Sequence, residues 1–314
     1  MLTNRREVIF FCFLGLILII LLAFISIFGS RQIDSSENQN IAGIPQMITD
    51  ISIDAKSAYV YDVYTGKVLY AKNENIRLPL ASLTKLMSAL VAIEIVPEYG
   101  VVQITNEALI TRGESGLVSG EHWILKDLLD FSLMTSANDG IRAIALALGS
   151  ISSSTPDTEL VIADFVEMMN AKAESLGMTG TYYLNDTGLD ESESRGGAYG
   201  SAFDQAKLVE YIIKNHPTLL SATKEISLNI ASLDGILHVA HNTNTIAVLI
   251  PGLMVSKTGS TSLAGGNLII VFDPEIGRPI IVSILGSTEE GRFNDALKLV
   301  GASIKSVENS VRLE

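Results

Sequence analysis

The chain has 314 residues, of which 47% are hydrophobic and 18% are charged, with 22 lysines and arginines against 35 aspartates and glutamates. This length and apolar content exclude a small disulfide-stapled scaffold and a mostly disordered protein. The formal net charge of −13 disfavours nucleic acid as a partner, because phosphates repel an acidic surface.

The N-terminal segment predicts a membrane anchor. Val8 to Gly29 carries no charge and almost no polar side chain, and at ~1.5 Å per residue a helix of this length crosses a ~30 Å hydrocarbon core. Arg5 and Arg6 precede the run, which keeps the N-terminus in the cytoplasm and places the rest of the chain on the outer side of the cell membrane. Because bulky Ile27 and Phe28 stand where signal-peptide cleavage needs small residues, we favour a single-pass transmembrane helix over a cleaved signal peptide.

The composition after the anchor is that of a polar linker followed by a globular domain. Residues 1–31 hold three arginines and one glutamate, a net of +2, which leaves −15 for the rest. The only cysteine, Cys12, lies in the apolar run, so the exported part has neither a catalytic thiol nor a disulfide. We expect a cytoplasmic tip and anchor over 1–30, a linker over 31–46, a globular domain over 47–308 and a tail over 309–314.

The first elements of the predicted domain are a hairpin and a helix. From Ala58 to Ala71, two β-rich runs flank Thr65-Gly66, a hairpin signal. Apolar residues then recur at helical spacing from Leu83 to Val91, which predicts a helix whose first turn starts near Ser82. A helical insert follows over about 100–215, with patterns at Ile124–Met134, Ile141–Leu148, Val161–Leu176 and Phe203–Ile213.

After Pro217 the patterns change to strands and end in one helix. The strands are predicted at Lys224–Ile230, Met254–Thr258, Asn267–Phe272 and Pro279–Leu285. The last helix places on one face Phe293, Leu297, Val300 and Ile304. This order predicts an α+β fold with an antiparallel sheet flanked by helices and a helical subdomain.

A hydroxyl and an amine stand three residues apart at the start of the first predicted helix. Ser82-Leu-Thr-Lys85 places both groups on one face, close enough for the amine to take the hydroxyl proton. A second copy of the pattern, Ser221-Ala-Thr-Lys224, falls in a segment predicted as strand. Only the first copy opens a helix, where unpaired N–H groups favour developing negative charge, so Ser82 is the candidate nucleophile.

Two further tripeptides complete a set. Ser136-Ala-Asn138 follows an apolar helical stretch, and Lys257-Thr258-Gly259 ends a short predicted strand. Each tripeptide is weak evidence alone, since Ser36-Glu-Asn38 in the linker has the same S-x-N form. In this order and context, however, the three motifs match the signature shared by class A β-lactamases and penicillin-binding proteins.

Longer segments carry the same resemblance over roughly residues 50 to 305. Leu80 to Glu94 resembles the nucleophile helix of the D-alanyl-D-alanine carboxypeptidases, the low-molecular-mass penicillin-binding proteins of serine peptidase family S11. Ala173 to Leu189, His241 to Asn244 and Lys257 to Leu268 are also similar to segments of that family. The resemblance implies a β-lactamase/D,D-peptidase-like fold and a serine D,D-peptidase domain, with peptidoglycan stem peptides as substrate, β-lactam antibiotics as inhibitors and no cofactor. The chain departs from better-known members by stopping after the catalytic domain.

The chemistry of peptide cleavage gives each motif a role. Ser82 attacks, and Lys85 is the base if burial and a nearby cation such as Lys257 keep its amine neutral. Ser136 relays a proton to the leaving amine, while Asn138 binds the substrate backbone or steadies Lys85. By resemblance, the backbone N–H groups of Ser82 and Ser260 form the oxyanion hole.

A carboxypeptidase must also bind a free terminal carboxylate. Lys257 and Thr258 are suited to this, and Arg292 resembles the carboxylate anchor of the family, since a guanidinium grips both oxygens. The alternative for Arg292 is a solvated arginine that opens the last helix.

Other polar residues predict no chemistry. The histidines have no metal-ligand spacing, so no metal is assigned; they are His122, His216, His238 and His241. Asp190, Glu191 and Glu193 are interpreted as a solvated acidic loop, with the border of the substrate groove as the alternative. Trp123 is assigned to packing.

Several functions remain open beside the D-Ala-D-Ala carboxypeptidase. A class A-like β-lactamase needs a glutamate that activates water, but Thr181 stands in the corresponding position of Thr181-Tyr-Tyr-Leu-Asn185, so a penicillin adduct on Ser82 should be long-lived. A non-catalytic module that binds peptidoglycan or β-lactams would have lost at least one catalytic group, whereas all are present. A D,D-endopeptidase of the same family stays open, because groove shape decides between the two peptidases.

Overall fold

The structure is a computed structural model that describes residues 47–152, 155 and 157–311. In chain order the elements are β1 (Ser57–Asp62), β2 (Lys67–Lys72), β3 (Leu78–Pro79), η1 (Ala81–Leu83), α2 (Thr84–Ile95), β4 (Val101–Gln103), α3 (Asn106–Leu109), β5 (His122–Ile124), α4 (Leu125–Thr135), α5 (Asn138–Ser152), α6 (Thr158–Ser175), β6 (Tyr182–Tyr183), β7 (Ala198–Gly200), α7 (Ala202–Asn215), η2 (Ser221–Lys224), β8 (Ser227–Ala231), β9 (Leu237–His241), η3 (Ala247–Leu249), β10 (Leu253–Thr261), β11 (Gly265–Phe272), β12 (Ile280–Ser287) and α8 (Gly291–Val311).

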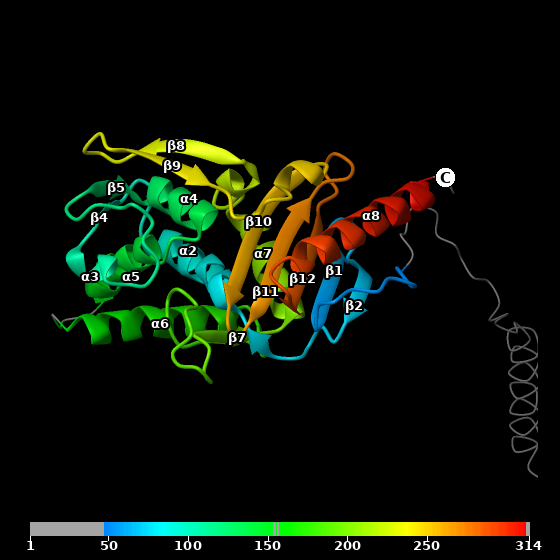
Figure 1. The fold of residues 1–314 in the computed structure, drawn as a ribbon, viewed down its shortest axis with the longest axis horizontal. Helices are drawn as coiled ribbons and strands as arrows, with labels where there is room; N and C mark the ends of the chain where they lie inside the picture. The colour runs from blue at the N-terminus through cyan, green and yellow to red at the C-terminus, as the bar shows by residue number, and fades with distance from the viewer. Residues whose placement is uncertain (1–46, 153–154, 156, 312–314) are drawn as a thin grey trace, which may run out of the picture. The chain divides into compact units, whose positions relative to one another are not determined.

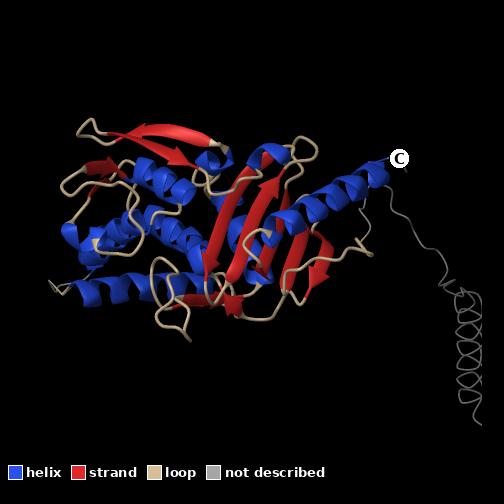
Figure 2. Cartoon of the chain, viewed as in Figure 1, coloured by secondary structure: helices blue, strands red, loops and turns tan. Residues whose placement is uncertain are grey.

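The largest sheet of the described chain has five strands in the order β10-β11-β12-β1-β2, and every neighbouring pair is antiparallel (Figure 2). Its β1–β2 hairpin confirms the prediction at Thr65-Gly66. Asp62 Oδ1 accepts hydrogen bonds from the N–H groups of Tyr64 and Thr65, both at 3.0 Å, and Gly66 adopts φ +68°. A left-handed residue at this position favours glycine, so the turn is encoded locally.

Helices cover both faces of this sheet, as the alternation along β11 shows. Leu268, Ile270 and Phe272 point to one face and pack in a core with α8, while Ile269 and Val271 point to the other and join the larger core under α2, α4 and α5. Figure 1 shows α8 lying along one face, with α7 behind the sheet. The α+β prediction is therefore confirmed.

The predicted helical insert contains a real helical block but is not uniform. The helices α4, α5, α6 and α7 match the four predicted patterns. However, α7 packs against β1 and β12 and so belongs to the sheet. The region also holds β4 paired with β5, and the strands β6 and β7, which form a small sheet of order β3-β7-β6 with β3 from before α2. These two- and three-residue strands are too short to leave a period in the sequence.

One predicted strand was wrong at its start. Ser221–Lys224 forms the short 3₁₀ helix η2, and the strand begins at Ser227. Within the described residues, this strand, β8, pairs only with β9, which was not predicted from the sequence, and the hairpin is separate from the five-stranded sheet. The last helix α8 runs to Val311, so the expected domain end at 308 falls inside it.

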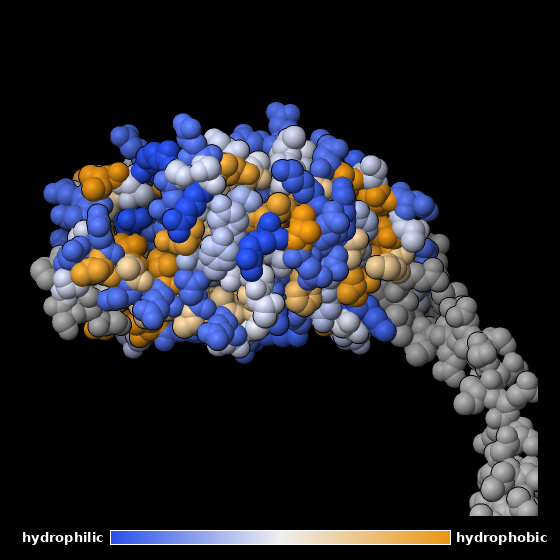
Figure 3. Space-filling model, turned by 90° about the horizontal axis from the view of Figure 1, so that it is seen from below, coloured by the Kyte–Doolittle hydropathy of each residue, from blue (hydrophilic) through white to orange (hydrophobic). Residues whose placement is uncertain are grey.

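The expected anchor at Val8 to Gly29 and the linker over 31–46 lie outside the described residues. Within the described ranges, no helix combines the length and the apolar content that crossing a membrane requires. On the face seen in Figure 3, apolar side chains lie in separate small groups between polar ones.

Candidate active site

The turn before α2 sets the position of Ser82. Ala81 adopts φ +49°, which is unfavourable for a residue with a Cβ, and the turn is held from outside. Leu80 N–H donates to the Ala198 carbonyl at 3.0 Å, and the buried Asn267 amide of β11 donates to the carbonyls of Pro79 and Leu80, both at 3.0 Å. The surroundings therefore impose the sharp turn that presents the Ser82 side chain.

Lys85, in the first turn of α2, is completely buried and points at Ser82. Its Nζ lies 2.9 Å from Ser82 Oγ, 2.7 Å from Asn138 Oδ1 and 2.8 Å from the Thr187 carbonyl oxygen. The last two oxygens can only accept hydrogen bonds. A neutral amine must therefore donate its two hydrogen bonds to Asn138 Oδ1 and the Thr187 carbonyl, and its lone pair then faces the Ser82 hydroxyl.

The environment of Lys85 favours this neutral form. Burial lowers its pKa to about 7, although the carboxylates of Asp186 and Asp139 oppose the shift. The orientation of Asn138 is fixed as well, because its Nδ2 donates to the Arg112 carbonyl at 2.7 Å and so leaves Oδ1 for Lys85. This is the steadying role expected for Asn138.

Ser136 and Lys257 meet on the opposite side of the site. Ser136 ends α4 in a left-handed conformation with φ +61°, and its Oγ accepts a hydrogen bond from Lys257 Nζ at 2.9 Å. Lys257 is buried on β10 and also donates to the Thr258 carbonyl at 2.8 Å. Burial, together with the positive charges of Lys85 and Arg292, lowers the pKa of Lys257 well below its ordinary value.

Gly259 lets β10 approach the start of α2. A Cβ at this position would lie 3.0 Å from the Leu80 carbonyl oxygen and 3.1 Å from Ser82 N, both backbone atoms that cannot move aside. Ser260 follows directly on the same strand, so the two N–H groups assigned to the oxyanion hole lie on touching segments. The Ser260 hydroxyl donates to Glu289.

Arg292 opens the last helix, as the alternative had it, but its side chain is half-buried and contacts β10. It lies in the first turn of α8, and its Nη1 donates to the Gly259 carbonyl at 2.9 Å. Burial lowers its pKa, with Glu289 opposing, and its guanidinium lies over the Phe293 ring at 4.8 Å. Within the described chain, its buried Nε has no hydrogen-bond partner.

The sequence analysis missed two residues that shape the site. Thr243 lies on the segment after β9, where its hydroxyl is 2.6 Å from that of Thr258 and its N–H donates to the Met134 carbonyl at 3.1 Å, near Ser136. Asn267 was also not predicted as a site residue, although it stabilises the turn before Ser82. Both lie in segments noted for their family resemblance, which was the only signal that pointed to them.

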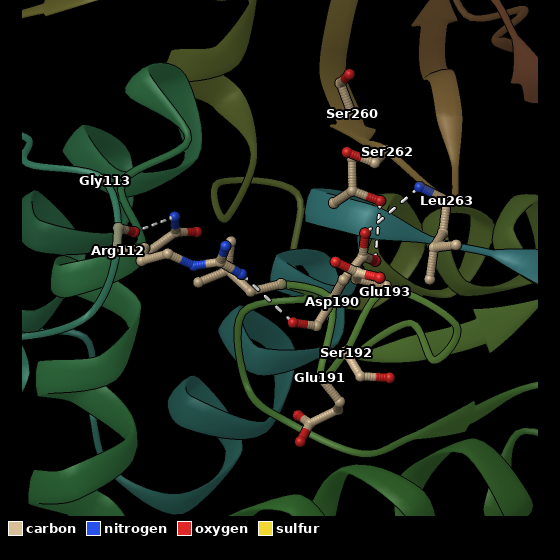
Figure 4. Close-up of a pocket in the computed structure, with 12 residues that line it drawn as sticks. Arg112, Gly113, Asp190, Glu191, Ser192, Glu193, Ser260, Ser262 and Leu263 are labelled. Carbon is tan, nitrogen blue, oxygen red and sulfur yellow. Dashed lines mark hydrogen bonds between the residues drawn. The ribbon is translucent and has the colours of Figure 1, made fainter.

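A cleft of about 780 Å³ opens beside these residues, and Asn138 and Ser260 are part of its lining (Figure 4). The rest of the lining comes from Arg112, Gly113, the loop Leu189 to Glu193 and the end of β10, Thr261 to Leu263. Asp190 accepts hydrogen bonds from Thr261 Oγ1 at 2.9 Å and from Leu263 N at 3.4 Å. The acidic cluster therefore borders the groove, which was the alternative interpretation, while Glu191 and Glu193 are also exposed, as expected for a solvated loop.

The remaining residues noted in the sequence lie elsewhere. Ser221 is exposed and donates to the Thr218 carbonyl at 2.8 Å, and its partner in the motif, Lys224, is exposed as well. Trp123 is fully buried, as assigned, and donates to Glu121 at 3.2 Å. In the described part of the chain, no cluster of His, Cys, Asp or Glu could hold a metal ion.

Comparison with known proteins decides the family. Residues 39–288 match the model of peptidase family S11, D-alanyl-D-alanine carboxypeptidase. The chain belongs to this family. It is 31% identical over 268 residues to D-alanyl-D-alanine carboxypeptidase DacF of Bacillus subtilis, covering 83% of this chain and 64% of that protein. It is also 32% identical over 219 residues to a D-alanyl-D-alanine endopeptidase of Pseudomonas aeruginosa, covering 68% and 66%. The chain thus spans just under two thirds of these relatives.

Solved structures of similar proteins share the fold. Penicillin-binding protein D2 of Listeria monocytogenes, in its ampicillin-bound form, has a TM-score of 0.65 at 27% identity, covering 81% of this chain and 99% of that one. The Streptomyces K15 DD-transpeptidase has a TM-score of 0.72 at 23% identity over the same shares. The expected β-lactamase/D,D-peptidase-like fold is confirmed.

The buried amine of Lys85 predicts the pH dependence of acylation. The neutral amine accepts the Ser82 proton, so the rate of acylation by a penicillin should rise with pH and level off above the Lys85 pKa of about 7. Well below that pH it should fall about tenfold per unit, because only the neutral fraction reacts. Stopped-flow acylation with a fluorescent penicillin from pH 5 to 9 measures this, and a profile that rises only towards pH 10 would contradict the assignment.

Proposed function

We propose that the protein is a serine-type D-Ala-D-Ala carboxypeptidase that removes the terminal D-alanine from peptidoglycan stem peptides. The contact between Lys85 Nζ and Ser82 Oγ, 2.9 Å, carries the proposal. Ser82 Oγ attacks the carbonyl of the penultimate D-alanine while its proton passes to Lys85, and the tetrahedral oxyanion is held by the N–H groups of Ser82 and Ser260. Breaking the C–N bond leaves an ester on Ser82, which water then hydrolyses.

The leaving D-alanine needs a proton on its amine. Ser136 Oγ can supply one and recover it from Lys257, which donates to it across 2.9 Å. After acylation, Lys257 has given up one proton and Lys85 holds the proton of Ser82. During hydrolysis of the ester, the attacking water gives its proton through Ser136 to Lys257, and Lys85 returns its proton to the leaving Ser82 oxygen, so both lysines are restored at each turnover.

The terminal carboxylate would lie where Lys257, Thr258 and Arg292 converge. The Arg292 guanidinium already reaches Gly259 on β10, next to the strand edge where the substrate would lie, and its Nε has no partner within the described chain. Arginine suits a carboxylate because its donors match both oxygens. This arrangement favours a free C-terminus and thus supports a carboxypeptidase.

β-Lactams would acylate Ser82 by the same attack, opening the lactam ring. The three partners of Lys85 are Ser82, Asn138 and Thr187, none of them a carboxylate, and Thr181 donates to Asp204 instead of holding a water. The adduct should therefore be slowly released, which disfavours a class A-like β-lactamase. The similar Listeria protein was solved in an ampicillin-bound form.

A D,D-endopeptidase is the second candidate, because one relative bears that name. It would cut a peptide bond that lacks the free carboxylate, so Arg292 would contribute little to its substrate. A non-catalytic binding module is disfavoured, since Lys85 and Lys257 are both buried in contact with a serine hydroxyl, an arrangement that a passive binder does not need.

We also propose that the protein is anchored in the cell membrane by residues 1–30, with residues 31–46 as a linker and the catalytic domain on the outer side. The uncharged run from Val8 to Gly29 behind Arg5 and Arg6 supports this. The substrate supports it as well, because peptidoglycan lies outside the cytoplasmic membrane.

Ser82 should be the only serine that becomes acylated. Incubation with a pentapeptide ending in D-Ala-D-Ala should release one alanine per peptide by mass spectrometry, and a fluorescent penicillin should label the peptide that contains Ser82. Ser82→Ala should abolish both, whereas the matched control Ser221→Ala should leave both unchanged. Fluorescent label that is retained in Ser82→Ala, or that maps to Ser221, would refute the assignment of Ser82 as the nucleophile.

Arg292 should distinguish carboxypeptidase from endopeptidase. Arg292→Ala should lower kcat/KM for a D-Ala-D-Ala terminus by ~1.5–3 kcal/mol, roughly ten- to a hundredfold, because a charged hydrogen bond is lost. An amidated terminus should be a poor substrate already and lose little more. The exposed Lys305 on the same helix gives the control Lys305→Ala, which should change neither rate. Equal losses on both substrates would make Arg292 structural and favour the endopeptidase.

The anchor should survive washing that removes peripheral proteins. Full-length protein should remain in the membrane fraction after high-salt and alkaline extraction, and external protease on spheroplasts should reach its catalytic domain. Native protein whose sequence starts near Ser30 would show that Val8 to Gly29 is a cleaved signal peptide instead.

A further inference from the structure

An ion pair with a buried carboxylate holds the loop that contacts the Lys85 amine. The Asp186 side chain is fully buried. Arg142 Nε donates a hydrogen bond to Asp186 Oδ2 at 2.9 Å, and Arg142 Nη2 makes an ion-pair contact with Oδ1 at 2.7 Å. A buried ion pair contributes little net stability, because desolvation offsets its attraction. Its place beside the candidate base therefore points to a role in the site.

The ion pair joins helix α5 to the loop at Asp186, and both of these contact the Lys85 amine. Arg142 lies one helical turn after Asn138 on α5, so one face of this helix holds both Lys85 and Asp186. The loop at Asp186 also contacts α2 through two backbone carbonyls. The Asp186 carbonyl accepts a hydrogen bond from Ser88 Oγ at 2.6 Å, and the Thr187 carbonyl accepts one from Lys85 Nζ at 2.8 Å.

We propose that Arg142 and Asp186 are positioning residues that lock the Thr187 carbonyl against the Lys85 amine, an inference that rests on the proposed role of Lys85 as the base. If the loop moved back, the amine would lose one of its two fixed acceptors, and its lone pair would no longer be aimed at Ser82. The loop is already pressed against the nucleophile turn, since a Cβ on Gly188 would lie 1.9 Å from the Ala81 carbonyl oxygen.

The pair also acts on the charge of Lys85. The charged groups around the amine are Asp186 on the loop, Asp139 and Arg142 on α5, and Lys257 on β10; burial lowers the Lys85 pKa, and the two carboxylates raise it. Burial raises the pKa of Asp186, and the Arg142 guanidinium opposes this shift and favours the carboxylate. Asp186→Asn keeps the size of the side chain but removes that negative charge and leaves the positive charge of Arg142 uncompensated. Both changes disfavour the ammonium form, so the Lys85 pKa should fall.

The test is the pH profile of acylation by a fluorescent penicillin in the full-length protein. In Asp186→Asn the acid limb should move to lower pH by about one unit, and the plateau rate should fall three- to tenfold as the loop loosens. The matched control Glu94→Gln removes the α2 partner of Lys172, at 2.6 Å on the surface, and should leave the profile unchanged. A folded Asp186→Asn protein with the wild-type acid limb would overturn the proposal.

A second variant keeps the test decisive if Asp186→Asn does not fold. Arg142→Lys retains the positive charge but cannot contact both carboxylate oxygens of Asp186 in the same way. The plateau rate of acylation should therefore fall at least threefold, while the acid limb of the pH profile moves by less than half a unit. An unchanged plateau rate would overturn the proposal. Failure of the proposed function looks different. If the proposed function is wrong, the Lys85→Ala protein should still be acylated, whatever the acylation rates of the Arg142 and Asp186 variants.

Discussion

The geometry of the site depends on the burial of the Lys85 amine beside the Ser82 hydroxyl. Removing Lys85 from water penalises its charged form, and the two acceptors that replace water are both unable to donate. The protonated amine can satisfy all three neighbours as a donor, while the neutral amine can satisfy them only by accepting from Ser82. With a pKa of about 7, the two forms lie close in free energy near neutral pH, as a proton-transfer group requires.

This arrangement needs elements that are far apart in sequence. The sheet supplies β10, whose Gly259 allows contact with the turn before Ser82, and Asn267 of β11 fixes that turn from behind. The helical block supplies Asn138 and, at the end of α4, the left-handed Ser136. The site therefore lies where the sheet meets the block, and the antiparallel sheet between α7 and α8 gives it a rigid wall.

The sequence predicted the residues of the site better than their surroundings. Ser82, Lys85, Ser136 and Lys257 were found because their chemistry requires fixed residue types at fixed spacing, and the long helices because a period of 3.6 repeats several times. The strands β6 and β7 were missed because two or three residues carry no period. The orientation of Asp190 into the cleft and of Arg292 towards Gly259 depends on contacts across 71 and 33 residues, which no local pattern encodes.

The most direct measurement is the titration of the Lys85 amine itself. With ¹⁵N-labelled lysine, nuclear magnetic resonance of the side-chain nitrogens in wild type and Lys85→Ala identifies the Lys85 signal and follows it with pH. We expect a change from ammonium to amine near pH 7 in the free protein, because burial outweighs the nearby carboxylates. A Lys85 signal that titrates near the ordinary lysine value of about 10.4 would contradict this, since the amine would then be charged at neutral pH and could not accept the Ser82 proton.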